Sequence, residues 1–525
     1  MIDRGPLSEN LSLRQAMRKP AARGGGGVVA AHHRVAAEAG AAVLRAGGNA
    51  VDAAVATAFA VGVAEPWMSG VGGIGVMLVR EARSGRVSVI DFGARAPAGL
   101  DPAAYVVAPG ADADLFGWPM VEGRRNLVGP YAVAVPAMVA GHAMAHELFG
   151  TKAWAELVAP AAAIAKAGVQ VDWHTTLWIA TAFADLAADP GCRALFLPGG
   201  APPYPARAVQ GPPPRLKWPA LARTLRAVAE GGPRAFYEGP VARAISAEVR
   251  AGGGFLSEED LAGCRAVRRE PAVLRYRGHD VHVAPELNGG PTLIEALDAL
   301  QRAWSPAGPA PDGAAFTAYA DALRPAWARR LKEMGDRSPH ATSTTNFCVV
   351  DRDGNVVVVT QTLLSLFGAR LLLPETGILM NNGVNWFDPR PGAPNSIGAG
   401  KRVLSNYAPA IAVGEGDAIA LGGAGGRKIL PAVFNLLSFM IDYRLSLEDA
   451  MHAPRIDVSG PDAVVADRTL GEAALATIAA RHPTVVADRE GYPYHFTIAS
   501  AVRLRGGDAE GAVEPWQPAA EAVAA

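Results

Sequence analysis

The hydrophobic pattern at the start of the chain predicts one short strand and two helices. After a glycine run that ends at Gly27, residues 28–31 are apolar and short enough for a strand. Two alanine-rich segments follow at 34–46 and 50–64, and each has the length of a helix. Asn49 precedes the second segment and can cap its amino-terminal end. The chain therefore begins with strand and helix in close succession.

A glycine cluster at 70–75 precedes two further predicted strands, at 76–79 and 87–92. Glycine-rich loops of this kind can bind dinucleotides, but such a loop follows a strand and opens a helix. Here the cluster follows a helix and opens a strand, so the order of elements argues against a dinucleotide site. We interpret the glycines as a turn at which backbone segments pack closely.

The middle of the chain, residues 130–330, is mainly helical with proline-rich breaks. One pair of predicted strands, at 273–276 and 280–283, interrupts the helices. Residues 335–343 are polar and contain a proline, which is typical of an exposed linker. After this linker the pattern changes to strands.

The strands that follow the linker form a predicted hairpin. Runs rich in β-branched residues at 345–350 and 355–362 flank a turn that contains Asp353. If the hairpin is centred at Asp353 or half a residue later, the residue opposite Thr344 is Thr362 or the residue after it. Thr344, at the start of one strand, would thus face a hydroxyl on the neighbouring strand. This arrangement by itself could be only a structural Thr–Thr pair across the two strands.

Composition and charge exclude several classes of protein. Half of the 525 residues are hydrophobic, and 59 Gly and 41 Pro indicate a large core with many turns. The net charge of −1 and the lack of a long basic run argue against nucleic acid as a partner. Cys192, Cys264 and Cys348 are too far apart for a metal motif, and we interpret them as reduced core thiols.

Residues 1–27 are expected to form a flexible arm because they end in four consecutive glycines. The arm carries basic residues but no apolar segment of signal-peptide length. The longest apolar stretch, 50–64, is interrupted by Asp52 and is too short to cross a bilayer. We therefore expect a cytoplasmic protein that does not contact a membrane.

The run TTNFCVVD at 344–351 resembles the cleavage motif of the γ-glutamyltranspeptidase family, in which the first threonine becomes the amino terminus of a small subunit. Further matches follow in the family's order between residues 28 and 500. These matches are residues 47–54, 72–73, 237–239, 289–290, 377–382, 401–405, 425–426 and 453–455. The resemblance implies an α+β fold, the four-layer αββα sandwich of N-terminal-nucleophile hydrolases. Residues 28–343 and 344–525 would be its large and small subunits, interwoven as one unit.

The resemblance also implies a self-processing reaction. In the precursor, the Thr344 hydroxyl attacks the carbonyl of Ser343, the chain shifts from nitrogen to oxygen, and water releases two polypeptides. The freed α-amine has a reference pKa of about 7.7–8, so near neutral pH it can take the proton from the hydroxyl of the same residue. One residue then serves as nucleophile and base. No metal or other cofactor is implied.

Other residues take their expected roles from the same resemblance. The backbone N–H groups of Gly425 and Gly426 would hold the oxyanion that forms when an amide is attacked; the alternative is a plain flexible turn. Thr362 would orient the nucleophile. Ser405 and Asn406 occupy the positions that bind the α-carboxylate of the donor.

The sequence departs from the family where the donor is recognised. Gly93 replaces the arginine that would bind the donor carboxylate. Arg95, two residues later, is either a substitute or a structural residue. The segment 388–400 is shorter than the lid of some family members, and a more open cleft favours hydrolysis over transfer to an amine.

The positions that bind the donor's ammonium have changed most. They fall at Leu364, Gly383 and Trp386, with Asn385 beside the last, so that no carboxylate remains to pair with an ammonium. An unpaired buried ammonium costs several kcal/mol. The acyl group is therefore expected to lack a charged amino end, as in relatives that act as cephalosporin acylases or small-amide hydrolases.

Several readings of the activity stay open at this point. The protein either acts on γ-glutamyl compounds or hydrolyses a different small acyl amide. An uncleaved homologue that only binds a ligand is the alternative outside catalysis. A metal-dependent amidase is disfavoured because the histidines show no ligand spacing. After cleavage the two fragments would form a heterodimer, and two such heterodimers could pair. The expected binding partner is a small-molecule amide substrate.

Overall fold

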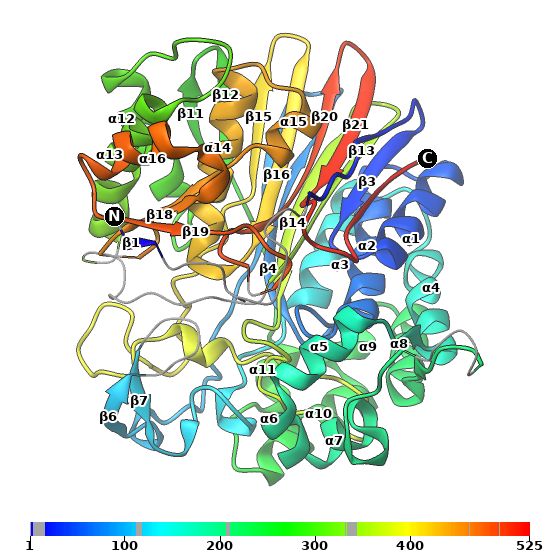
Figure 1. Ribbon diagram of the computed structural model, residues 1–525. Coiled ribbons are helices and arrows are strands. Elements are labelled where there is room, and N and C mark those ends of the chain that lie inside the picture. Colours follow the sequence, from blue (N-terminus) through cyan, green and yellow to red (C-terminus); the bar gives the residue numbers. More distant parts are fainter. Residues whose placement is uncertain are drawn as a thin grey trace.

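The computed structural model describes residues 2–3, 16–111, 118–205, 211–330, 332, 344–460, 462–492 and 494–525. Two antiparallel seven-stranded sheets pack face to face, and helices cover the outer face of each (Figure 1). The strand order is β10-β5-β4-β14-β13-β3-β22 in the first sheet and β11-β12-β15-β16-β20-β21-β2 in the second. This arrangement is the αββα sandwich expected from the sequence.

The strands of the first sheet are β3 (Gly27–Ala31), β4 (Ile74–Arg80), β5 (Val87–Phe92), β10 (Val267–Arg269), β13 (Thr345–Asp351), β14 (Val356–Thr362) and β22 (Glu521–Ala524). Those of the second are β2 (Ala22–Arg23), β11 (Ala272–Tyr276), β12 (His279–Val283), β15 (Ala410–Gly414), β16 (Asp417–Ala424), β20 (Ile498–Arg505) and β21 (Asp508–Val513). The central strands of both sheets are buried on both faces, which suits their continuous runs of apolar residues.

The outer layer on the first sheet consists of α1 (Arg34–Arg45), α2 (Ala50–Ala64), α3 (Met138–Phe149) and α4 (Trp154–Ala167). Helix α2 contacts β13 and β14 and packs against the other three helices, of which α1 and α3 also contact the sheet. All residues of α2 are buried. A helix that is apolar on every side fits such a position. Asn49 caps α2 as expected, in a capping box with Asp52.

The outer layer on the second sheet consists of α12 (Gly290–Ala303), α13 (Gly313–Arg329), α14 (Ile429–Ile441), α15 (Leu447–His452) and α16 (Glu472–Ala479). A small sheet lies beside it. Its strands, in spatial order, are β1 (Ile2–Asp3), β19 (Thr484–Ala487), β18 (Val464–Asp467) and β17 (Ile456–Asp457).

Short helices form the lower part of the molecule in Figure 1. They are α5 (Trp173–Thr181), α6 (Phe183–Ala188), α7 (Pro190–Phe196), α8 (Pro219–Gly231), α9 (Arg234–Tyr237), α10 (Gly239–Ala251) and α11 (Glu258–Ala262). Two ribbons complete the fold, β6 (Val107–Ala111) with β7 (Pro119–Val121), and β8 (Val169–Gln170) with β9 (Arg215–Leu216). Within the described ranges, no helix combines the length and the hydrophobicity that crossing a bilayer requires.

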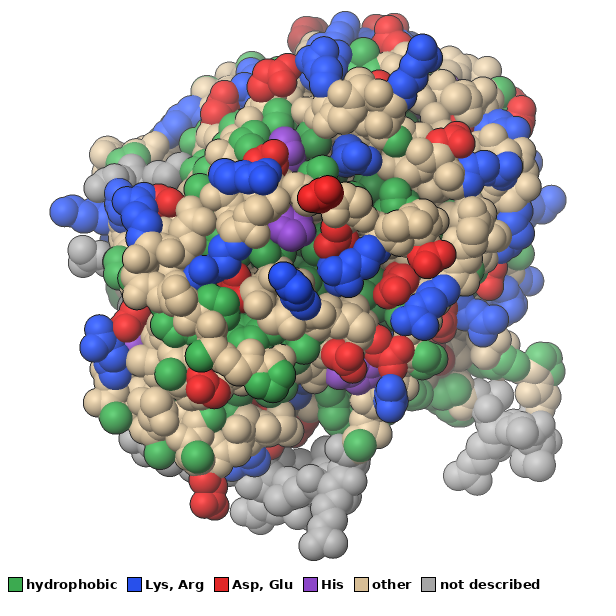
Figure 2. Space-filling model, turned by 90° about the horizontal axis from the view of Figure 1, so that it is seen from above, with side chains coloured by type: hydrophobic (Ala, Val, Ile, Leu, Met, Phe, Trp, Pro, Cys, Tyr) green, Lys and Arg blue, Asp and Glu red, His purple; other side chains and the backbone are tan. Residues whose placement is uncertain are grey.

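Basic and acidic side chains are interspersed over the face shown in Figure 2. On this face the two signs are mixed rather than separated into two regions.

The described parts of the expected N-terminal arm, residues 2–3 and 16–27, both contact the rest of the fold. Strand β1 pairs with β19. Ala22 and Arg23 pair with β21, and the Lys19 ammonium donates to the backbone oxygens of Gln517 and Ala520 at 2.5 and 2.6 Å. Side-chain contacts and strand pairing hold this segment where the glycine run had suggested flexibility. The predicted linker at 335–343 lies outside the described residues.

Strands β13 and β14 lie between β3 and β4 in the first sheet. The part of the chain after residue 343 therefore shares a sheet with the part before it. The division into two subunits at that point stays a prediction.

Candidate active site

Thr344 directly precedes β13, a central strand of the first sheet. The predicted hairpin is present, and its register pairs Thr345 with Gln361. Continued by one residue, this register places Thr344 opposite Thr362. Both threonines are buried, with 2% and 0% of their surface exposed. The hairpin thus brings two hydroxyl-bearing residues together at its open end.

The side chains at the start of β13 alternate between the two faces of the sheet. Asn346 faces the second sheet, where its Oδ1 accepts a 2.5 Å hydrogen bond from the Ser500 hydroxyl. Thr345 faces the opposite way and donates a 2.7 Å hydrogen bond to Glu65, at the end of α2. Because strand side chains alternate, Thr344 shares the orientation of Asn346, toward the second sheet.

A glycine turn lies at the same end of the two sheets. Gly422 on β16 packs against Asn346 so closely that a Cβ there would be 2.3 Å from the amide nitrogen. The end of β16 therefore meets the start of β13. The turn that follows contains Gly425 (φ 141°) and Gly426 (φ 62°), conformations that favour glycine. Among the described residues, no oxygen accepts from the N–H of either glycine. Their role in holding an oxyanion stays a prediction.

Thr362 begins a strained turn. Its hydroxyl accepts a 2.7 Å hydrogen bond from the backbone N–H of Leu364. Leu364 is buried and has a φ of 87°, a region that L-residues with large side chains rarely adopt. Strain of this kind persists only where the surroundings impose it, and it is often found at functional sites.

One 3₁₀ turn, Gly383–Trp386, carries three of the residues expected to contact the acyl donor. A Cβ at Gly383 would lie within 3.0 Å of two alanine side chains, so there is no room for a side chain. The Asn385 carboxamide oxygen accepts a 2.7 Å hydrogen bond from Asn126. Trp386 is buried and packs edge-on against Tyr407, with ring centroids 5.2 Å apart. The turn is buried and closely packed.

Ser405 and Asn406 are held by a buried arginine that the sequence analysis did not single out. The guanidinium of Arg330 donates to the backbone oxygen of Ser405 at 2.5 Å and to the side-chain oxygen of Asn406 at 3.3 Å. The Ser405 hydroxyl donates to Asn288 Oδ1 at 2.9 Å. Burial, and then the charge of Arg427, lower the pKa of Arg330 to about 9.

Arg95 lies near this segment through its backbone. It forms a β-bridge with Arg402, three residues before Ser405, and its own side chain is exposed. The Arg402 guanidinium instead binds Asp91 at 2.6 Å and Glu286 at 3.0 Å. A role for Arg95 in binding a donor carboxylate stays a prediction.

Ser343, on the other side of the expected cleavage point, lies outside the described residues. Within the part of the chain that is described, no group of three His, Cys, Asp or Glu side chains could hold a metal ion. The sequence analysis did not single out Glu65, Arg330 or Asn346. A carboxylate that directly follows a largely apolar helix was the available signal for Glu65.

Comparisons with known proteins agree with this geometry. A family model described as gamma-glutamyltranspeptidase matches residues 36–342 and 337–524. The "Acylase ACY 1 proenzyme" of Pseudomonas sp. (strain V22) is 36% identical over 513 residues, 90% of this chain and 89% of that protein. The "Glutathione hydrolase proenzyme" of Escherichia coli (strain K12) is 30% identical, covering 80% of this chain and 79% of that protein. The crystal structure of cephalosporin acylase from Bacillus halodurans superposes with a TM-score of 0.84 at 26% identity, covering 98% of this chain and 99% of that one.

The four layers, with a buried threonine at the head of a central strand, define an N-terminal-nucleophile hydrolase. The chain belongs to the γ-glutamyltranspeptidase family. It is an enzyme of that family's self-processing, amide-cleaving kind.

Proposed function

We propose that this protein is an acylase within the γ-glutamyltranspeptidase family. It cleaves itself before Thr344 and then hydrolyses amides whose acyl group carries no α-ammonium. The observation that carries the proposal is the buried, closely packed environment of Leu364, Gly383 and Trp386.

This environment provides no partner for the α-ammonium of a γ-glutamyl donor. Gly383 has no space for the amide side chain that a glutamyl donor would use, and Leu364 and Trp386 are buried hydrophobic residues. The nearby amide of Asn385 is engaged by Asn126. A buried ammonium without a carboxylate costs several kcal/mol, which corresponds to a loss of orders of magnitude in affinity. The higher identity to an acylase than to a glutathione hydrolase supports the same conclusion.

The mechanism uses one residue for two tasks. The unprotonated α-amine of Thr344 accepts the proton of its own hydroxyl as the oxygen attacks the substrate carbonyl. The N–H groups of Gly425 and Gly426 stabilise the oxyanion, and the proton passes to the leaving amine as the carbon–nitrogen bond breaks. Water then attacks the acyl ester and releases the acid and the free hydroxyl.

The segment after Trp386 is compact. The backbone N–H of Asp388 donates to the oxygen of Asn395 at 2.9 Å, and that of Ile397 donates back to Asp388 at 3.0 Å. A loop closed on itself in this way leaves little chain to cover a substrate. An open cleft gives water access to the acyl-enzyme and favours hydrolysis.

Two matched substrates test the proposal. Glutaryl and γ-glutamyl p-nitroanilides differ only in the α-amino group. We expect kcat/KM for the glutaryl compound to exceed that for the γ-glutamyl compound by at least about tenfold, equivalent to 1.4 kcal/mol. A preference for the γ-glutamyl compound would show that the protein is a glutathione-type enzyme.

A denaturing mass measurement tests the alternative outside catalysis, an uncleaved homologue that only binds a ligand. Two fragments that meet between Ser343 and Thr344 would exclude an uncleaved binding protein. The cytoplasmic location and the pairing of heterodimers stay predictions, which fractionation of the native cells and light scattering of the purified protein would test.

A further inference from the structure

Glu65 is a buried carboxyl group behind the strand that begins with the nucleophile. It directly follows α2, and its side chain is inaccessible to solvent. One carboxyl oxygen accepts the 2.7 Å hydrogen bond from the Thr345 hydroxyl, and the other lies 3.5 Å from the Gln517 amide nitrogen. Burial raises the pKa of Glu65 to about 8. The group is therefore neutral near pH 7, which makes glutamine its closest replacement.

Glu65 sits on a rigid turn. Its backbone oxygen accepts from the N–H groups of Met68 and Ser69 at 3.0 and 3.1 Å. The Ser69 hydroxyl accepts in turn from the side chain of Gln361, the strand partner of Thr345. Thr345 is thus held by a strand neighbour and by a side-chain bond, both attached to the same turn.

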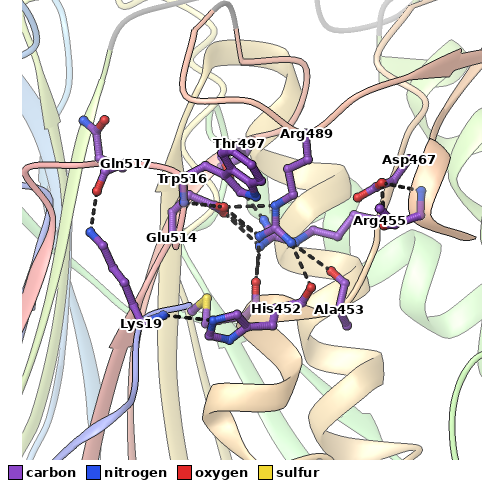
Figure 3. A network of polar contacts seen from close by, with 12 residues as sticks. Lys19, His452, Ala453, Arg455, Asp467, Arg489, Thr497, Glu514, Trp516 and Gln517 are labelled. Carbon is purple, nitrogen blue, oxygen red and sulfur yellow. Dashed lines mark hydrogen bonds and ion pairs between the residues drawn. The ribbon is translucent and has the colours of Figure 1, made fainter. Parts of the chain in front are cut away.

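Gln517, whose amide contacts Glu65, belongs to the network shown in Figure 3. The backbone oxygen of Gln517 accepts from the Lys19 ammonium at 2.5 Å, and its N–H donates to the backbone oxygen of Glu514. The Glu514 carboxylate binds the guanidinium groups of Arg455 and Arg489, each at 2.9 Å. These bonds give Gln517 a fixed position from which to contact Glu65.

We propose that Glu65 is a positioning residue for the nucleophile: its carboxyl group holds the Thr345 hydroxyl and so keeps Thr344 in place. The inference rests on the proposed function, because it assumes that Thr344 becomes an amino terminus. A strand that starts at a free amino terminus tends to fray unless it is tied down. Thr345 directly follows Thr344, so its hydrogen bond to Glu65 holds the strand one residue after the nucleophile.

Four variants and two controls test the inference. Glu65→Leu and Thr345→Val remove one partner of the hydrogen bond, whereas Glu65→Gln and Thr345→Ser keep it. The controls are Asp442→Asn, a buried carboxyl bonded to hydroxyl groups on the other outer layer, and Thr57→Val, which removes a buried hydroxyl from α2. For each variant, the cleaved fraction is measured by denaturing mass, and kcat and KM are measured per cleaved chain.

We expect Glu65→Leu and Thr345→Val to lower kcat by about 100-fold, the effect of a small misplacement of a reacting group, with KM within about threefold. Glu65→Gln and Thr345→Ser should stay within about fivefold of wild type, since each keeps the bond. A double variant that combines Glu65→Leu with Thr345→Val should lose little more than either single variant, because both substitutions remove the same bond. Both controls should keep the wild-type kcat.

The inference is overturned if Glu65→Leu and Thr345→Val keep the wild-type kcat, or if Thr345→Ser loses as much as Thr345→Val. If Glu65→Leu does not fold, the comparison of serine with valine at 345 decides alone. An active and cleaved Thr344→Ala variant would refute the proposed function itself. An inactive Thr344→Ala beside an unaffected Glu65→Leu would refute only the role of Glu65.

Discussion

The Ser500 hydroxyl on β20 donates a 2.5 Å hydrogen bond to Asn346 on β13, and this bond joins the two sheets two residues after Thr344. The amide nitrogen of Asn346 donates to the backbone oxygen of Val359 on β14 at 2.8 Å. Asn346 therefore ties together three strands between the layers. Gly422 is needed opposite it because a side chain there would occupy the same space.

Gly422→Ala should lower the free energy of unfolding by about 1–3 kcal/mol, because its Cβ would overlap the Asn346 amide in a closely packed layer. Self-cleavage should slow as well, since the displaced strand carries Thr344. Chemical denaturation measures the first effect and the mass of freshly purified protein the second. Gly99→Ala is the control, because Gly99 is exposed with open space around it. Equal stabilities of the two variants would contradict the packing argument.

Thr344→Ala should leave a single full-length chain and reduce hydrolysis by more than about 1000-fold, since the nucleophile is lost. Thr344→Ser should still produce two fragments because it keeps the hydroxyl. The measurement is the denaturing mass, with turnover of the glutaryl anilide. Cleavage of the alanine variant at the same bond would mean that another group breaks the chain.

Trp386→Asp should shift the ratio of kcat/KM toward the γ-glutamyl anilide by about tenfold or more relative to the glutaryl anilide, because it supplies a carboxylate for the ammonium. The variant should also be less stable, since it loses the contact with Tyr407. Trp386→Phe keeps an aromatic ring and should leave the ratio unchanged. A ratio that moves equally in both variants would show that lost packing, not charge, controls the preference.

Four buried histidines should make the protein sensitive to acid. Burial lowers the pKa of His32 to about 3 and those of His33, His142 and His174 to about 4. Between pH 6.5 and about 4 the unfolded chain binds protons that the folded chain does not, so stability falls as pH falls. Each such histidine contributes about 1.4 kcal/mol per pH unit over that range.

His174 provides the test of this pH dependence. Its Nε2 accepts a 2.8 Å hydrogen bond from the Trp178 indole, which a neutral ring can do and an imidazolium cannot. His174→Gln keeps an acceptor and removes the titration. The slope of unfolding free energy against pH between 6.5 and 4.5 should then decrease by about 1.4 kcal/mol per pH unit, the contribution of one proton. An unchanged slope would mean that His174 is also neutral in the unfolded state or charged in the folded one.

Local patterns predicted much of the first sheet. The apolar run at 28–31, the helices that follow it and the hairpin after residue 344 are all present, because each depends on neighbouring residues alone. The same reasoning assigned residues 1–27 to a flexible arm. It could not anticipate that β2 would pair with β21, nearly 500 residues later in the chain.

Residue order and local motifs were enough to predict the classes of elements, the candidate nucleophile and the family resemblance. Which side chains meet depends on the folded chain: Glu65 contacts Thr345, Arg330 contacts Ser405, and Asn346 contacts Ser500. These pairs are 75 to 280 residues apart. Their contacts arise because two sheets and their helices bury one common interior, where each polar group must find a partner in space whatever its place in the chain.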